Sequence, residues 1–153
     1  IELKGSAPAA RLAMWAAVAR GERFVSFMSE DGAIAPLLPL GETAGVITRN
    51  EALFAPLRPR SGGVTSVSSA GGGAPVDVKL LESPDALVII GLNPAAAPRA
   101  ATITFTTEIP EAIWQNLETG TAVNFVMGKE GPFLEHTFAP RDVLVLMIRK
   151  SRR

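Results

Sequence analysis

The chain has 153 residues, the length of one ordinary domain or of a small domain plus part of another. The charges of its 15 basic and 15 acidic residues cancel, so the chain has no net charge. It therefore lacks the positive charge that would favour nucleic acid or a membrane surface as a partner. The absence of cysteine excludes disulfides, thiolate zinc sites and a cysteine nucleophile, and the single histidine, His136, excludes a multi-histidine metal site.

The first predicted element is a helix over residues 9–20. Ser6 is a suitable N-cap, and Gly21 follows the last turn as a stop signal. The helical spacing places one apolar face on Leu12, Trp15, Ala16 and Ala19.

A short strand is expected at residues 24–28, where the apolar residues do not alternate with polar ones. That pattern is typical of a strand buried on both faces, as in a parallel sheet. A second helix is predicted over residues 42–57 and ends before Pro59 and the glycines that follow.

From Val64 onward the sequence predicts strands only, separated by glycine- and proline-rich turns. Residues 102–106 alternate strictly, which predicts one wet face, and residues 143–148 are apolar almost throughout, which predicts a central strand. Seven short strands at this spacing favour an antiparallel β-sandwich. The predicted strands are 64–69, 76–81, 86–92, 102–107, 122–126, 133–138 and 143–148.

The element order predicts a mainly β chain of two units. Residues 1–60 form a helix–strand–helix segment, and residues 61–153 form the antiparallel sandwich. Because one parallel strand cannot make a sheet, the first unit needs neighbouring strands from outside this chain.

The first unit contains motifs in the order found in one enzyme family. Ile1-Glu2-Leu3-Lys4-Gly5 resembles the end of the seventh strand in (β/α)₈ retaining glycoside hydrolases of the β-galactosidase type, where the nucleophile glutamate lies. Trp15-Ala16-Ala17-Val18-Ala19-Arg20-Gly21 is similar to the helix that follows. Residues 24–28 and 42–57 then resemble the eighth strand and the last barrel helix. The resemblance implies the end of a barrel, whose first six strands are not in this chain.

Two motifs in the second unit resemble the tail sandwiches of these hydrolases. Trp114-Gln115-Asn116-Leu117-Glu118-Thr119-Gly120 is similar to a hairpin of such domains, and Ala139-Pro140-Arg141-Asp142-Val143 is similar to their approach to the final strand. The resemblance implies a C-terminal portion of a glycoside hydrolase, with the sandwich as a structural accessory domain.

A retaining glycosidase uses two carboxyl groups about 5 Å apart, one as nucleophile and one as acid/base. The resemblance makes Glu2 the nucleophile candidate, with an acid/base supplied from outside this chain. Glu30 and Asp31 follow the predicted strand at the face where barrel enzymes keep their sites, so they are candidates for contacts with sugar hydroxyls or simply turn residues.

Aromatic rings can stack on the apolar face of a sugar, but this chain has few. Trp114 lies between strands, so it is either an exposed sugar contact or a packing residue, whereas the helical position of Trp15 favours the core. His136 alternates with apolar residues and is expected to be structural rather than an acid/base. Gly71-Gly72-Gly73 lacks the lysine of a phosphate loop, and we expect no cofactor.

Three hypotheses about partners follow. In the first, the rest of the barrel, or a second chain that completes it, is the partner. In the second, the sandwich is a non-catalytic module that binds carbohydrate or a protein. In the third, the chain forms a homo-oligomer through its orphan strand, because an unpaired edge is adhesive. The compartment is not indicated by the sequence.

Overall fold

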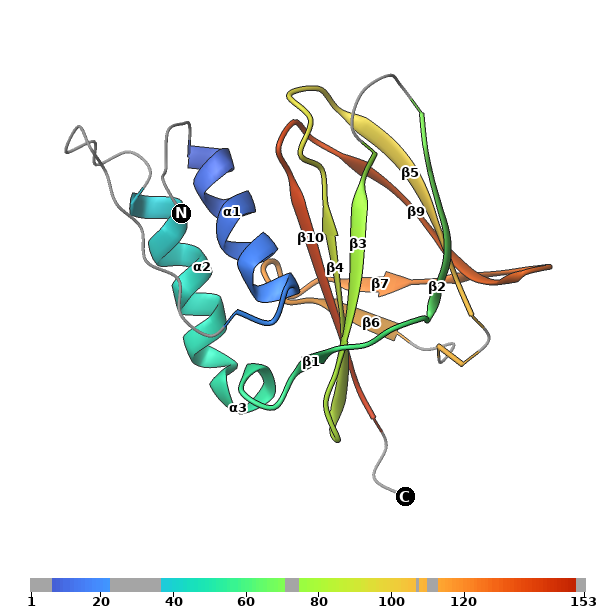
Figure 1. The fold of residues 1–153 in the computed structure, drawn as a ribbon, viewed down its shortest axis with the longest axis horizontal. Coiled ribbons are helices and arrows are strands. Elements are labelled where there is room, and N and C mark those ends of the chain that lie inside the picture. The colour runs from blue at the N-terminus through green and yellow to red at the C-terminus, as the bar shows by residue number, and fades with distance from the viewer. Residues whose placement is uncertain (1–6, 23–36, 71–74, 107, 110–112, 151–153) are drawn as a thin grey trace.

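The computed structural model describes residues 7–22, 37–70, 75–106, 108–109 and 113–150 (Figure 1). They form three layers: helices cover one face of a six-stranded sheet, and a four-stranded sheet covers its other face. The helices are α1 (Ala7–Ala19), α2 (Leu37–Arg49) and α3 (Glu51–Phe54). The strands are β1 (Arg58–Pro59), β2 (Val64–Ser69), β3 (Asp77–Glu82), β4 (Ala86–Leu92), β5 (Arg99–Phe105), β6 (Ile113–Asn116), β7 (Ala122–Asn124), β8 (Val126–Gly128), β9 (Gly131–Phe138) and β10 (Val143–Arg149).

Helix α1 ends as the sequence predicts. Gly21 has a φ of 78°, in the left-handed region that favours glycine. Its N–H donates to the carbonyl of Val18 at 2.9 Å, and the N–H of Glu22 donates to the carbonyl of Ala17 at 3.1 Å. These two bonds form a Schellman motif and satisfy carbonyls that the helix end would leave unpaired.

Helix α2 begins earlier and ends earlier than predicted. It starts at Leu37, which places Pro39 in the first turn. Proline is tolerated there because its missing N–H removes no helical hydrogen bond. The helix ends at Arg49, and Asn50 then separates it from α3. The side-chain amide of Asn50 donates to the carbonyl of Val46 at 2.8 Å, in competition with the main chain.

The described strands form an antiparallel sandwich, as predicted. The six-stranded sheet has the order β1-β3-β4-β10-β6-β7, and the four-stranded sheet has the order β2-β5-β9-β8. The sequence missed β1 and β6, and it merged β7 and β8 into one strand. Alternate residues of β5 are buried, which confirms its one wet face.

The two central strands of the six-stranded sheet, β4 and β10, are buried on both faces. Leu87 and Ile89 of β4 belong to the core between the sheets, whereas Val88 and Ile90 belong to the core under the helices. Strand β10 alternates in the same way and lies between β4 and β6, which confirms its central position. Two covered faces explain why both strands are continuously apolar in an antiparallel sheet.

The predicted barrel strand, residues 24–28, lies outside the described residues. Helices α1 and α2 on either side of it are present, and they share a core with the six-stranded sheet. The division into units at residues 60 and 61 therefore stays a prediction. None of the described helices is long and apolar enough to cross a membrane.

Candidate functional site

Of the four predicted site residues, the structure describes Trp114 alone. Glu2, Glu30 and Asp31 lie outside the described residues. Trp114 lies on β6, and it is 0% exposed. Its indole stacks on Phe125 with ring centroids 5.1 Å apart, and Phe125 stacks in turn on Phe105 at 4.9 Å. A fully buried ring has no free face for a sugar, so the expectation of an exposed Trp114 is wrong and the packing alternative holds.

The expectation that Trp15 belongs to the core is confirmed. Trp15 is fully buried in the core under the helices, with its ring 5.8 Å from that of Phe54. His136 is half-buried and meets Phe138 edge-on at 4.6 Å. Burial lowers the pKa of His136 below its usual value, although the negative charge of Asp142 opposes that shift. The structural role expected of His136 stays a prediction.

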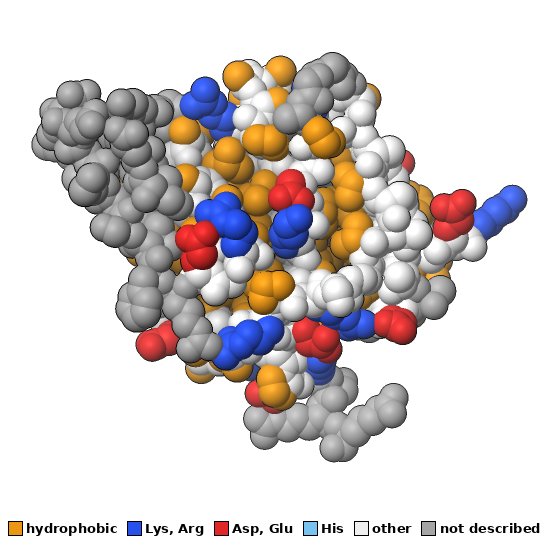
Figure 2. Space-filling model, in the orientation of Figure 1, with side chains coloured by type: hydrophobic (Ala, Val, Ile, Leu, Met, Phe, Trp, Pro, Cys, Tyr) orange, Lys and Arg blue, Asp and Glu red, His pale blue; other side chains and the backbone are white. Residues whose placement is uncertain are grey.

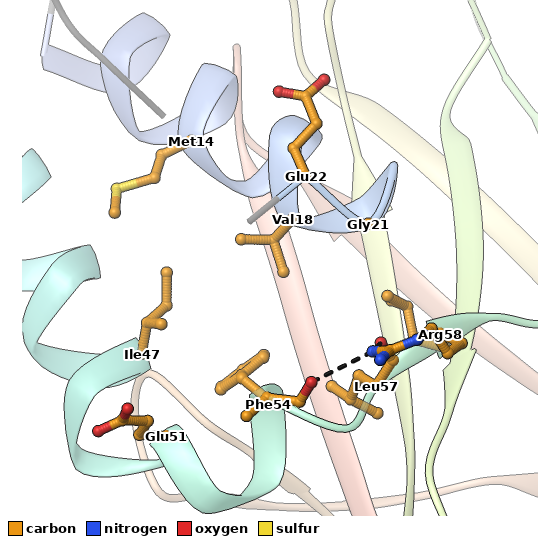
Figure 3. Close-up of a pocket in the computed structure, with 11 residues that line it drawn as sticks. Met14, Val18, Gly21, Glu22, Ile47, Glu51, Phe54, Leu57 and Arg58 are labelled. Atoms are coloured by element: carbon orange, nitrogen blue, oxygen red, sulfur yellow. Dashed lines mark hydrogen bonds between the residues drawn. The ribbon is translucent and has the colours of Figure 1, made fainter. Parts of the chain in front are cut away.

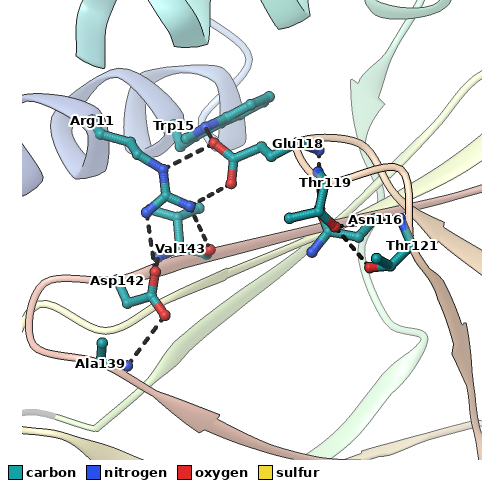
Figure 4. A network of polar contacts seen from close by, with 9 residues as sticks. All are labelled: Arg11, Trp15, Asn116, Glu118, Thr119, Thr121, Ala139, Asp142 and Val143. Carbon is teal, nitrogen blue, oxygen red and sulfur yellow. Dashed lines mark hydrogen bonds and ion pairs between the residues drawn. The ribbon is translucent and has the colours of Figure 1, made fainter. Parts of the chain in front are cut away.

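A polar cluster joins the helical layer to the sandwich. We call Arg11, Glu118 and Asp142 the Arg11 clamp (Figure 4). The guanidinium of Arg11 donates from Nε to Glu118 Oε1 at 2.9 Å and from Nη1 to Asp142 Oδ1 at 3.0 Å, and it also pairs through Nη2 with Glu118 Oε2. Nη2 donates further to the carbonyl of Val143 at 2.9 Å, and Trp15 Nε1 donates to Glu118 Oε1 at 2.9 Å. One helix is thus tied to two loops of the sandwich.

The β6–β7 turn holds Glu118 in place. The side-chain oxygen of Asn116 accepts hydrogen bonds from the N–H of Glu118 at 2.9 Å and of Thr119 at 3.2 Å. The N–H of Gly120 donates to the carbonyl of Asn116 at 2.8 Å, and Gly120 has a φ of 73°. An asparagine that bonds to the backbone ahead of it and a glycine in the left-handed region are the residues such a turn requires.

The β9–β10 turn holds Asp142 in a similar way. Asp142 Oδ2 accepts a hydrogen bond from the N–H of Ala139 at 3.1 Å, and Oδ1 accepts one from the N–H of Val143 at 2.8 Å. Three of the motifs that resemble glycoside hydrolase segments therefore meet at the clamp. They contribute Trp15 of α1, Glu118 of the β6–β7 turn and Asp142 of the β9–β10 turn.

The clamp is partly buried, with side-chain exposures of 25% for Arg11, 16% for Glu118 and 25% for Asp142. Burial alone would lower the pKa of Arg11, but its hydrogen bonds and ion pairs with both carboxylates outweigh burial and raise that pKa. The Glu118 carboxylate accepts from Arg11 and from the indole of Trp15, and the Asp142 carboxylate accepts from Arg11 and from two backbone N–H groups. The cluster is therefore suited to fixing a helix against a sheet rather than to proton transfer.

Arg11 is not among the site residues predicted from the sequence. A signal was present, because Arg11 is the one charged residue between Ala7 and Ala19. A lone charge in an apolar helix needs a partner when the helix is covered.

A second feature is an apolar groove of about 370 Å³ between α1, α2 and α3. Figure 3 shows Met14 of α1 and Ile47 of α2 pointing toward each other across it, with Phe54 at one end. The rim carries Glu51 and Arg58, and Arg58 Nη1 donates to the carbonyl of Leu57 at 2.7 Å. The groove offers packing surface and no arrangement of nucleophile and base.

The charged surface agrees with the balanced composition. Figure 2 shows acidic and basic side chains interspersed on the visible face, without a patch of one sign. Among the described residues, no group of three or more histidine, aspartate or glutamate side chains could hold a metal ion.

Comparison with known proteins gives a likeness of fold. No protein-family profile matches the chain, and no curated protein matches it. An α-amylase from Geobacillus thermoleovorans, solved with acarbose, has 10% sequence identity and a TM-score of 0.61 over 95% of this chain, which spans 34% of the amylase chain. A GH42 β-galactosidase from G. stearothermophilus, solved also as a catalytic mutant, has 15% identity and a TM-score of 0.36 over 73% of this chain and 13% of its own.

Proposed function

We propose that this chain is the C-terminal portion of a barrel-type glycoside hydrolase and that its sandwich is a structural accessory domain. The Arg11 clamp carries the proposal, because it and the apolar core around it fix the helices on the sheet. The fold likeness to an α-amylase over 95% of the chain supports the same assignment. The sandwich then stabilises the last helices of the barrel.

In this proposal the two catalytic carboxyl groups come from different parts of the barrel, one of them from this chain. Glu2 is the nucleophile, and the acid/base comes from a barrel strand outside this chain, since a retaining glycosidase needs both carboxyl groups. Glu30 and Asp31 contact sugar hydroxyls at the same face. The partner of the sandwich is therefore the remainder of the barrel.

The test uses a polypeptide that contains the other barrel strands together with this chain. We expect hydrolysis of nitrophenyl glycosides, and Glu2→Gln should lower kcat by about a thousandfold or more because the amide cannot form the glycosyl intermediate. Glu135→Gln, a matched change at an exposed position of β9, should leave kcat unchanged. Full activity in Glu2→Gln, or no glycosidase activity in the wild type, would contradict the proposal.

A further inference from the structure

The strands at the edges of the two sheets differ in length. Strands β1, β7 and β8 each end a sheet and are only two or three residues long. Strand β2 ends the four-stranded sheet on its other side and is six residues long (Figure 1). Because an unpaired edge can hydrogen-bond to another strand, natural proteins keep such edges short or place proline or charges on them. Among the described strands, β2 is therefore the edge best able to accept a further strand.

The register of β2 shows which of its main-chain groups face outward. The N–H of Ala70, just after β2, donates to a carbonyl of β5 at 3.0 Å. Antiparallel pairs alternate between those that exchange hydrogen bonds and those that do not. Along the register from Ala70, Ser68 therefore bonds to β5, whereas Val67 and Ser69 direct their N–H and C=O groups away from it. We call this outward side of residues 66–69 the β2 edge.

The residues of the β2 edge match a second copy of the same edge. When two copies run antiparallel about a two-fold axis at Val67, Val67 lies opposite itself and Ser66 lies opposite Ser68 on both sides of the axis. Val67 is a suitable centre because its outward N–H and C=O can exchange two hydrogen bonds with its copy. Ser66 and Ser68 are both exposed, so their hydroxyls can hydrogen-bond across the strands. The bulge in β2 precedes Ser66 and leaves the β2 edge in regular register.

The charges around the β2 edge favour an uncharged partner strand. No charged residue lies on β2, and Arg99, the one charged residue of β5, is 4% exposed. An acidic or basic peptide would therefore gain no ion pair at this edge, whereas β2 of a second copy is itself uncharged. The chain as a whole has no net charge, so two copies do not repel each other.

We propose that two copies of this chain associate through the β2 edge, so that their four-stranded sheets form one continuous sheet. Hydrogen bonds hold the contact, because the side chain of Val67 packs against the core of its own copy. We expect the buried area to lie below the roughly 1,200 Å² typical of stable complexes. The dissociation constant is accordingly expected to be about 0.1 mM. The inference uses described residues only and depends neither on a barrel nor on the strand predicted at residues 24–28.

Sedimentation equilibrium of the chain from about 10 µM to about 500 µM tests the association, and the average mass should rise from monomer toward dimer. Ser68→Lys should weaken association by at least about tenfold, because an edge lysine opposes strand pairing and the two lysines lie diagonally across the axis. Thr137→Lys is the matched control, since it adds the same charge at an exposed position of β9, an interior strand of the same sheet. This variant should associate as the wild type does. A wild type that stays monomeric at the highest concentration, or an equal effect of the two lysines, would overturn the proposal.

Disulfide cross-linking tests the antiparallel register. The chain has no cysteine, so Ser66→Cys and Ser68→Cys each introduce a single thiol. Residues opposite each other on paired strands are close enough for a disulfide, whereas the two copies of one residue lie diagonally and beyond its reach. On oxidation, a mixture of the two variants should therefore give at least about fivefold more linked dimer than either variant alone. Equal yields from the mixture and from the separate variants would overturn the pairing about Val67.

Discussion

The two faces of the six-stranded sheet are covered in different ways. The core between the sheets is closed by aromatic side chains that stack on one another, among them Phe105, Trp114 and Phe125. The core under the helices is mostly aliphatic, and the partly buried Arg11 clamp lies at its margin. The comparison indicates that apolar packing holds the two sheets together, whereas the ion pairs and hydrogen bonds of the Arg11 clamp position the helices on the sandwich.

The largest expected effect concerns the core between the sheets. Trp114→Ala should lower the free energy of unfolding by about 3–5 kcal/mol, because it removes a fully buried ring and leaves a cavity. Urea unfolding followed by circular dichroism measures this loss. Gln115→Ala, at the exposed neighbouring position, should change stability by less than about 0.5 kcal/mol. Equal losses in the two variants would contradict the packing described for Trp114.

The Arg11 clamp should give an intermediate effect that is confined to the helices. Arg11→Leu should cost about 1–3 kcal/mol, less than for a fully buried pair, because Glu118 and Asp142 keep some contact with water. Hydrogen exchange should show faster opening of α1 while β4 stays protected.

A double-variant cycle sharpens this prediction. Glu118→Leu together with Arg11→Leu should cost at least about 0.5 kcal/mol less than the sum of the single changes. Additive losses in the free energy of unfolding would show that Arg11 and Glu118 do not act together. An equal loss of hydrogen-exchange protection in α1 and β4 would show that the clamp does not hold the helices on the sheet.

A smaller effect is expected from pH. Burial lowers the pKa of His136, so the unfolded chain takes up a proton on this residue at a higher pH than the folded chain does. The contribution of His136 is therefore fully present above its unfolded pKa of about 6.5 and is lost as pH falls through the lower folded value. Thermal melts between about pH 7.5 and 5.5 should show a smaller decrease in Tm for His136→Gln than for the wild type. An identical decrease in both would contradict the assignment.

The smallest effect concerns an exposed ion pair at the end of α1. Arg20 and Glu22 are 53% and 40% exposed and lie 2.7 Å apart. Glu22→Gln should change the free energy of unfolding by less than about 0.5 kcal/mol, because solvent already screens this pair. Urea unfolding of this variant beside Arg11→Leu compares an exposed and a partly buried arginine pair on one helix. A loss in Glu22→Gln as large as in Arg11→Leu would remove the distinction between them.

The sequence predicted the sandwich well where the local pattern reflects burial. Residues 143–148 were expected to be central because they are apolar throughout, and β10 lies in the middle of its sheet. The same pattern at residues 24–28 predicts a strand of a parallel sheet, yet β4 shows this pattern in an antiparallel sheet. A continuous apolar strand indicates two covered faces and does not indicate the direction of its neighbours.

The errors have physical reasons of two kinds. Helix α2 begins before the predicted residue 42 and includes Pro39 in its first turn, where proline is tolerated. The clamp could not be predicted because Glu118 and Asp142 lie 107 and 131 residues from Arg11 in the chain. Contacts at that separation depend on the tertiary fold rather than on spacing.

The most direct test of the proposed function is the effect of Arg11→Leu in the full barrel-type hydrolase that we propose, measured as kcat on a glycoside and as the rate of thermal inactivation. We predict an unchanged kcat at 25 °C and faster inactivation on heating, since the clamp joins a helix to two turns of the sandwich. Loss of kcat at 25 °C with unchanged thermal inactivation would contradict this account, because the clamp would then belong to the chemistry and not to the structure.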